Sequence, residues 1–228
     1  MDGKEDRRHF DDIYSKYMLG GSRCTVSCDD LHKARCLIKY VWRAFKLSTL
    51  YADKRVLDVG CGLGFIAEAL RLAGAKVTAI DISSVAIQLA KELFPKIDFH
   101  CIYFPLEMID QGEFDIIWTR DFTLLDTHDV DSIVVKFIKP CIQLLRTGGI
   151  VIIGYRSNFT GRTDPGHLAA WDIETIMELK EKCGLLGPCI VQVPFTFLSN
   201  FFIKWFGVLK NKTIPFYFVL KKDEKRNN

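Results

Sequence analysis

Short apolar runs alternate with amphipathic segments along most of this 228-residue chain. Continuous apolar runs of roughly four to eight residues are typical of strands buried on both faces, and apolar residues at helical spacing are typical of the helices that cover them. The pattern predicts strands at 55–60, 76–81, 97–102, 114–119, 149–155, 188–194 and 215–221. It predicts helices at 31–47, 65–73, 84–94, 129–145 and 170–183, with a kink at Pro140. This order indicates an α/β fold: a doubly wound, seven-stranded, mostly parallel sheet with helices on both faces.

The helix at 31–47 is amphipathic and basic. Asp29 and Asp30 offer an N-cap and negative charge at its start. Its apolar and basic positions fall on separate faces: Leu31, Ala34, Ile38, Val41 and Phe45 against Lys33, Arg35, Lys39, Arg43 and Lys46. We expect the apolar face to dock on the sheet. A role of the basic face in contacting an anion or a membrane surface is the alternative.

Composition and charge narrow the class of protein. Hydrophobic residues make up 49% and charged residues 26%, which is typical of one globular domain. A net charge of +3 does not favour nucleic acid as a partner. The start of the chain has no apolar core of a secretory signal, so we expect a cytoplasmic protein. Among the eight cysteines, only Cys24, Cys28 and Cys36 cluster, and they lack the paired spacing of a zinc site, so no metal is expected.

The residues best suited to bind a ligand lie in and beside one glycine-rich turn between two predicted strands. The turn and its flanking acids are Asp58, Gly60, Gly62, Gly64 and Asp81. A dinucleotide fingerprint would need a small third residue where Phe65 stands. Asp58, two residues before the first glycine, would repel a pyrophosphate but suits an ammonium group, and Asp81 can accept both hydroxyls of a ribose. A ligand with an ammonium group, a ribose and no phosphate matches S-adenosylmethionine (SAM).

This motif, with an acid ending the next strand, resembles the class I SAM-dependent methyltransferase family. The resemblance implies SAM as cofactor, S-adenosylhomocysteine (SAH) as product and an antiparallel pair of strands at the end of the chain. It also implies an N-terminal helical cap at 1–50 and a SAM-binding domain at 51–228. Ligands of such sheets lie at the carboxyl ends of the strands. The predicted cofactor contacts are therefore Asp58, Gly60, Cys61, Gly62, Gly64, Asp81, Ile82, Tyr103, Phe104 and Thr119. Tyr103 stands where family members often carry an acid for the adenine.

The residues at the end of the fourth predicted strand indicate which kind of acceptor group would be methylated. It lacks the Asn/Asp-Pro-Pro-aromatic sequence with which similar enzymes hold an amide or a base amino group, so methylation of adenine or glutamine is not expected. Asp121 is the candidate catalytic base or substrate-orienting group, and Arg120 a candidate contact for an anion. The alternative is that Arg120 and Asp121 form an ion pair in a loop, without a part in chemistry.

An aromatic insertion at about 195–210 is the other unusual feature. Residues 195–209 contain five phenylalanines and one tryptophan. The segment fits a hydrophobic flap, a dimer surface, a lid over an apolar substrate, or a patch that touches an anionic membrane. We therefore expect a SAM-dependent methyltransferase of a small, apolar metabolite, as a monomer or homodimer. The alternatives are a methyltransferase of protein or RNA, and a binding protein without catalytic activity.

Overall fold

The computed structural model describes residues 3–18, 30–47, 51–105, 107, 113–157, 171–184, 186–190 and 214–222. The strands are β1 (Arg55–Val59), β2 (Lys76–Asp81), β3 (Asp98–Cys101), β4 (Phe114–Arg120), β5 (Leu145–Ser157), β6 (Leu186–Ile190) and β7 (Ile214–Lys221). The α-helices are α1 (Gly3–Met18), α2 (Leu31–Ala44), α3 (Phe65–Leu72), α4 (Ser84–Leu93), α5 (Val130–Ile133), α6 (Lys139–Leu144) and α7 (Ile173–Cys183). A 3₁₀ turn, η2 (Thr123–Leu125), and a π-helical turn, η3 (Val134–Ile138), complete them.

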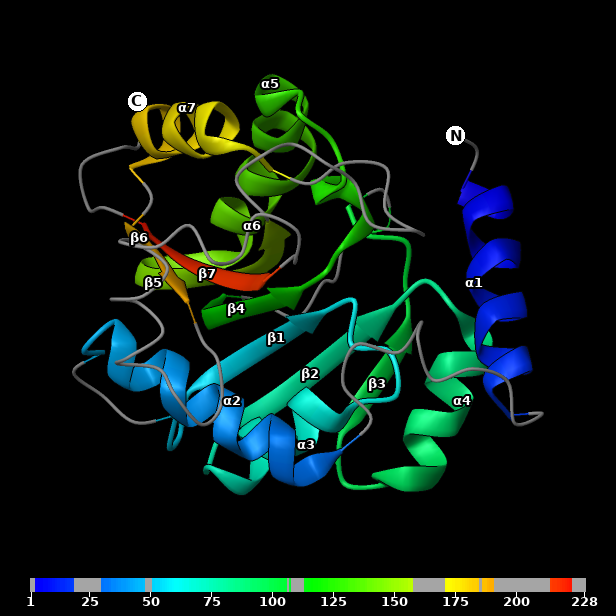
Figure 1. The fold of residues 1–228 in the computed structure, drawn as a ribbon. Helices are drawn as coiled ribbons and strands as arrows, with labels where there is room; N and C mark the ends of the chain where they lie inside the picture. The colour runs from blue at the N-terminus through cyan, green and yellow to red at the C-terminus, as the bar shows by residue number, and fades with distance from the viewer. Residues whose placement is uncertain are drawn as a thin grey trace.

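The strands form one seven-stranded sheet in the order β3-β2-β1-β4-β5-β7-β6 (Figure 1). The first five of these strands are parallel, whereas β7 runs antiparallel to both β5 and β6. The predicted fold, including the antiparallel pair, is confirmed. Because the strand order reverses between β1 and β4, a crevice opens there at the carboxyl ends of the strands, where ligands of such sheets bind.

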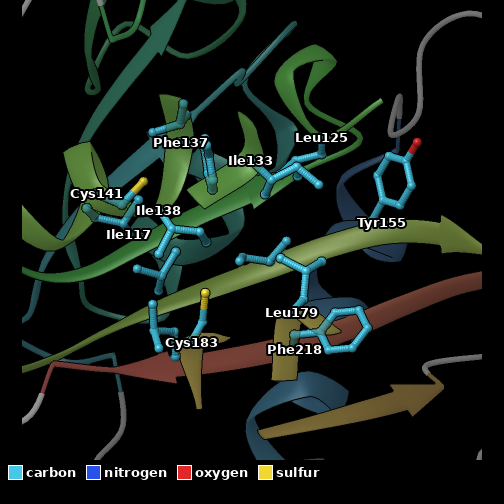
Figure 2. Packing of buried hydrophobic residues seen from close by; sticks show 14 of the residues in the cluster. Ile117, Leu125, Ile133, Phe137, Ile138, Cys141, Tyr155, Leu179, Cys183 and Phe218 are labelled. Carbon is cyan, nitrogen blue, oxygen red and sulfur yellow. The ribbon is translucent and has the colours of Figure 1, made fainter. Parts of the chain in front are cut away.

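Alternate residues of the strands fill two cores, one on each face of the sheet. Leu57 of β1 faces a core with α5, η3, α6 and α7, part of which Figure 2 shows. Val56 faces the other core, with α2, α3 and α4. Ala34, Leu37, Ile38 and Val41 of α2 are buried there, and the Asp30 side chain accepts from the Lys33 amide at 2.8 Å. The predicted docking of this helix and its N-cap are confirmed.

Several boundaries differ from the prediction. The predicted helix at 129–145 is three pieces, α5, η3 and α6, because Pro140 has no N–H to continue the α-helical ladder and the Lys139 amide reaches back to the Val134 carbonyl. β5 starts at Leu145 instead of Gly149. β6 starts before the predicted strand at 188–194, whose last four residues lie outside the described ones, as does the aromatic insertion at 195–210.

α1 lies within the helical cap expected at 1–50, but its helix was not predicted as a separate element. It lies alongside α4 at the edge of the sheet that carries β3 (Figure 1). Asp11 joins the two helices, because its carboxylate accepts from the Ser83 and Ser84 hydroxyls at 2.7 and 3.1 Å and from the Val85 amide at 3.2 Å. None of the helices in the described ranges is long and apolar enough to cross a membrane.

Candidate active site

The glycine turn between β1 and α3 lies at the crevice. Gly60, Gly62 and Gly64 have positive φ angles of 73°, 52° and 80°, which side chains rarely adopt. A Cβ atom on Gly60 would stand 2.9 Å from the Phe122 ring, and one on Gly62 would stand 2.6 Å from the Tyr14 hydroxyl. One on Gly64 would meet the Phe99 ring. The first two glycines therefore let side chains from β4's loop and from α1 approach the turn, whereas Gly64 serves the packing of α3 on the sheet.

Asp81, at the end of β2, is fixed by backbone amides. Its Oδ2 accepts from the Gly62 amide at 2.8 Å and its Oδ1 from the Ser83 amide at 2.9 Å. Burial raises the pKa of Asp81, although these hydrogen bonds oppose the rise. Each carboxylate oxygen has lone pairs left after one hydrogen bond. Asp81, which is 7% exposed, therefore keeps lone pairs for further hydroxyl donors.

Asp58, at the inner end of the turn, is 2% exposed. Its Oδ2 has no hydrogen-bond partner among the described residues. Burial, together with the nearby charge of Asp81, raises the pKa of Asp58 to about 8. A buried carboxyl oxygen without a partner costs free energy, and a ligand with a cationic donor would satisfy it.

A small hollow, with a cavity volume of about 40 Å³ and partly open to solvent, lies over the turn. Five of the predicted site residues line it: Asp58, Gly60, Cys61, Gly62 and Arg120. Tyr14 of α1, Trp118 of β4 and the start of α3 complete its wall. The site residues predicted from the sequence therefore include most of the glycine turn in the wall of the hollow, but not Tyr14 or Trp118.

The other predicted cofactor contacts do not line this hollow. Thr119 is fully buried and its hydroxyl donates to the Val59 carbonyl at 3.0 Å, which ties β4 to β1. Phe104 is buried against Phe122 and Phe137, and the Ile82 carbonyl accepts from the Cys101 thiol. A cofactor contact by Thr119, Phe104 or Ile82 stays a prediction.

Tyr103 follows β3, as the sequence indicates. Its hydroxyl donates to Asp6 of α1 at 2.9 Å, and its amide donates to Glu107 at 2.9 Å. Glu107 also pairs with Arg7 of α1 at 3.7 Å. An acid therefore does stand near this strand end, four residues later than expected, and Tyr103 links it to α1. Contact of Tyr103 with adenine stays a prediction.

Arg120 and Asp121 form an ion pair, with 3.4 Å between Nε and Oδ2. Asp121 has a φ angle of 51° and its amide donates to the Gly154 carbonyl of β5 at 2.9 Å. This turn brings the carboxylate back beside Arg120. Arg120 lines the hollow, whereas Asp121 does not. Their roles as anion contact and base stay predictions.

Tyr14 could have been found from the sequence. Phe10, Ile13, Tyr14 and Tyr17 recur at helical spacing, which predicts an amphipathic helix. Burial raises the pKa of the Tyr14 hydroxyl well above its usual value, and the charges of Asp81 and Cys61 add to the rise. Tyr14 therefore lies as a neutral hydroxyl against the glycine turn.

A parallel sheet with its crevice between β1 and β4, a glycine turn and an acid at the end of each of two adjacent strands define the class I methyltransferase fold. Residues 56–149 match the family described as a methyltransferase domain, so the resemblance seen in the sequence is confirmed. The ubiquinone biosynthesis O-methyltransferase of Aromatoleum aromaticum is 41% identical over 106 residues, which is 44% of this chain and 43% of that protein. The match thus spans less than half the length of this relative.

Solved structures agree on the fold. Phosphoethanolamine N-methyltransferase 2 of Haemonchus contortus, in complex with SAM, superposes with a TM-score of 0.62 at 16% identity, over 93% of this chain and 56% of that one. The [4+2]-cyclase SpnF superposes with a TM-score of 0.64 at 18% identity, over 97% of each chain. These identities are low, so both likenesses concern the fold alone.

Proposed function

We propose that the protein is a SAM-dependent methyltransferase of a small metabolite. One observation carries the proposal: two buried carboxyl groups flank a glycine turn, and they offer different kinds of recognition. Asp81 is held by two backbone amides with lone pairs to spare, whereas Asp58 has an oxygen without a partner. The first suits the two hydroxyls of a ribose and the second suits an ammonium group.

The residues present fit SAM better than a dinucleotide. A pyrophosphate in the hollow would lie against Asp58, and two negative groups in a buried place repel one another strongly. The glycine turn also has no small residue at Phe65, where the fingerprint needs close packing of helix and strand. When bound, SAM would supply a methyl group on a sulfonium, and a nucleophile would bond to that methyl carbon in line with the breaking C–S bond, with SAH as the leaving group.

The chain's part in the reaction is to orient both reactants and to exclude water. Asp81 and the turn are one hydrogen-bonded unit, since the Gly60 and Cys61 amides also donate to the Ile80 carbonyl at 2.9 Å. Tyr14 closes the turn from the side of α1. Asp121 remains our candidate for taking a proton from the acceptor, because it follows the carboxyl end of β4.

The acceptor is proposed from the relatives. Their name, ubiquinone biosynthesis O-methyltransferase, favours a hydroxyl oxygen of a small molecule as the atom that is methylated. An apolar acceptor would also agree with the aromatic residues of 195–209, through which we propose contact with the substrate or a membrane surface. The protein would act as a monomer or homodimer.

The test has two stages. Thermal unfolding is first followed with SAM, SAH and NAD in parallel, because a ligand at about 100 times its dissociation constant adds roughly 2.7 kcal/mol to stability. We expect both adenosyl ligands, and not NAD, to raise the midpoint. Formation of SAH is then measured with phenols and with amines of matched size. Turnover with phenols supports the proposal, and turnover with amines alone would contradict oxygen as the acceptor.

Binding of SAM without turnover of any acceptor would favour a different function. The likeness to a [4+2]-cyclase shows that this fold also occurs in a protein named for another activity. A binding protein without catalytic activity would then be the better proposal. Absence of any shift with SAM or SAH would contradict the cofactor itself.

A further inference from the structure

The outer face of α2 carries only positive charge. Its apolar face is buried on the sheet, on the side opposite α5, α6 and α7 (Figure 1). Arg35, Lys39 and Arg43 follow one another at every fourth residue, so they form a row along the outer face of the helix. All three are exposed, and Lys46, just past the helix, is exposed as well. At 1.5 Å of rise per residue, the row is about 12 Å long.

No acidic side chain of the described ranges neutralises this row. α2 itself contains no acid, and none of the described acids forms an ion pair with Arg35, Lys39 or Arg43. α7 shows the usual arrangement at the same spacing, since Lys182 pairs with Glu178 at 2.7 Å. Like charges four residues apart destabilise a helix. The row therefore lowers the stability of the protein alone, which favours a role in binding an anionic partner.

The chemistry of α2 favours a lipid surface over nucleic acid. Proteins that hold single strands add aromatic rings on which bases stack, and proteins that read a duplex also use amide side chains. Tyr40 and Trp42 of α2 pack against the core instead, and the helix contains no Asn or Gln. Five basic residues and no acid lie in 31–47, which is typical of helices that bind acidic lipids.

We propose that the outer face of α2 docks on an anionic membrane surface, with Arg35, Lys39 and Arg43 against the phosphate groups of acidic lipids. Because the apolar face of α2 is occupied by the core, the helix lies on the headgroups and does not insert. Docking is therefore reversible and sensitive to salt. The proposal goes beyond the proposed function and does not depend on it, since α2 does not line the hollow.

Vesicles of equal parts phosphatidylglycerol and phosphatidylcholine test this surface, beside vesicles of phosphatidylcholine alone. Sedimentation measures the partition of the wild type and of the triple variant Arg35→Gln, Lys39→Gln, Arg43→Gln at about 0.05 M and 0.5 M salt. Each basic residue near an anionic surface contributes about fivefold to binding, so the triple variant should bind roughly 100 times more weakly at low salt. The wild type should lose most of its binding at high salt and should not need phosphatidylcholine.

The matched control places the same change of charge on the opposite side of the sheet. Lys136→Gln, Lys139→Gln and Lys180→Gln together change exposed residues of η3, α6 and α7, and they should leave vesicle binding nearly unchanged. Lys39→Glu keeps the test valid where the triple variant folds poorly, because the new acid would pair with both arginines of the row and stabilise α2. It should also weaken vesicle binding. Circular dichroism and the unfolding midpoint show which variants are folded.

The outcomes separate this proposal from the others. Salt-sensitive binding to acidic vesicles that the triple variant loses and the control keeps supports docking through α2. Equal binding by the wild type and the triple variant, or no binding by the wild type, would overturn it. Binding that persists at high salt would assign membrane contact to the aromatic residues of 195–209 instead.

Nucleic acid and the cofactor are tested with the same proteins. Binding of the wild type, but not of the triple variant, to poly(U) RNA without binding to vesicles would overturn the membrane in favour of nucleic acid. Calorimetry should give the same affinity for SAH in the wild type and in every variant. Failure to bind SAH would therefore contradict the proposed function and leave the vesicle result standing.

Discussion

Replacing Asp58 with asparagine should stabilise the ligand-free protein and weaken SAH binding at the same time. The two side chains have nearly the same shape, so the variant changes charge and little else. Asp58 lies in the hollow at 2% exposure, with one oxygen lacking a partner. Its ionised form is therefore costly until a cation binds, and asparagine avoids this cost.

The size and sign of the stability effect follow from the pKa. Burial, and then the charge of Asp81, raise the pKa of Asp58 from 3.8 to about 8 in the folded protein. A carboxyl whose pKa is raised on folding contributes stability that is complete below the unfolded pKa and is lost as pH rises through the folded pKa. Each pH unit of that interval corresponds to about 1.4 kcal/mol, which gives an upper limit of about 6 kcal/mol.

Urea unfolding of the wild type and Asp58→Asn, without ligand, measures the effect from pH 4 to pH 9. The difference between the two free energies of unfolding should shift in favour of the variant as pH rises from 4 and should level off above about pH 8. Glu92→Gln is the control, since Glu92 is exposed on α4 and its difference from the wild type should stay flat. Asp81 and Cys61 also lie close enough to interact electrostatically with Asp58, and burial raises the pKa of both groups.

A difference that does not change between pH 4 and pH 9 would refute this reasoning, because it would mean that burial does not hold Asp58 neutral. In the binding arm, the variant should lose roughly 10–100-fold in affinity for SAH, as expected for one charge-assisted hydrogen bond. Greater stability with weaker binding is the usual sign of a residue retained for function.

Three other variants test the rest of the site. Asp81→Ala should abolish detectable SAH binding by calorimetry while the circular dichroism spectrum stays native; unchanged affinity would contradict the assignment of Asp81 to the ribose. Gly62→Ala places a Cβ 2.6 Å from the Tyr14 hydroxyl and should lower the free energy of urea unfolding by roughly 1–3 kcal/mol. Adding Tyr14→Phe should restore part of this loss, because the nearest ring atom is 3.6 Å away from that Cβ. Equal cost in both backgrounds would show that the φ angle alone is responsible. Asp11→Ala removes the acceptor of three hydrogen bonds to the start of α4 and should raise amide exchange in α1 without lowering protection of β1; unchanged exchange would mean that other contacts hold α1.

The strands of the sheet and the turn with its two acids were predictable, because they follow from local rules. Apolar runs between amphipathic segments predict buried parallel strands, and glycines at alternate positions predict a backbone that no side chain could follow. Asp58 and Asp81 each end an apolar run, so their place at the carboxyl ends of β1 and β2 follows from the strands. Predicting these features required no knowledge of contacts between residues far apart in the sequence.

Trp118 shows what the sequence does not reveal. On a buried strand it reads as one more core residue, and in shape it is one. Its indole N–H has no acceptor among the described residues, because of the atoms of β1, α3 and β7 that surround it, and no spacing along the chain encodes that. Asp121 is similar, since its left-handed backbone brings the carboxylate back to Arg120, and aspartate only sometimes adopts such a conformation.

The site has two parts: the glycine turn, which backbone hydrogen bonds fix to the sheet, and α1, which is attached mainly through side chains. The glycine turn is fixed, because the amides of Gly60 and Cys61 bond to β2 and the Gly62 amide bonds to Asp81. α1 meets that turn through the Tyr14 hydroxyl, and Asp11 holds it on α4. Asp6 and Arg7 add side-chain contacts to Tyr103 and Glu107. Most of these contacts involve partly exposed side chains, so they break at a lower free energy than the sheet. A ligand that enters the hollow would therefore displace or reorder α1, while the carboxyl groups that recognise it stay in place.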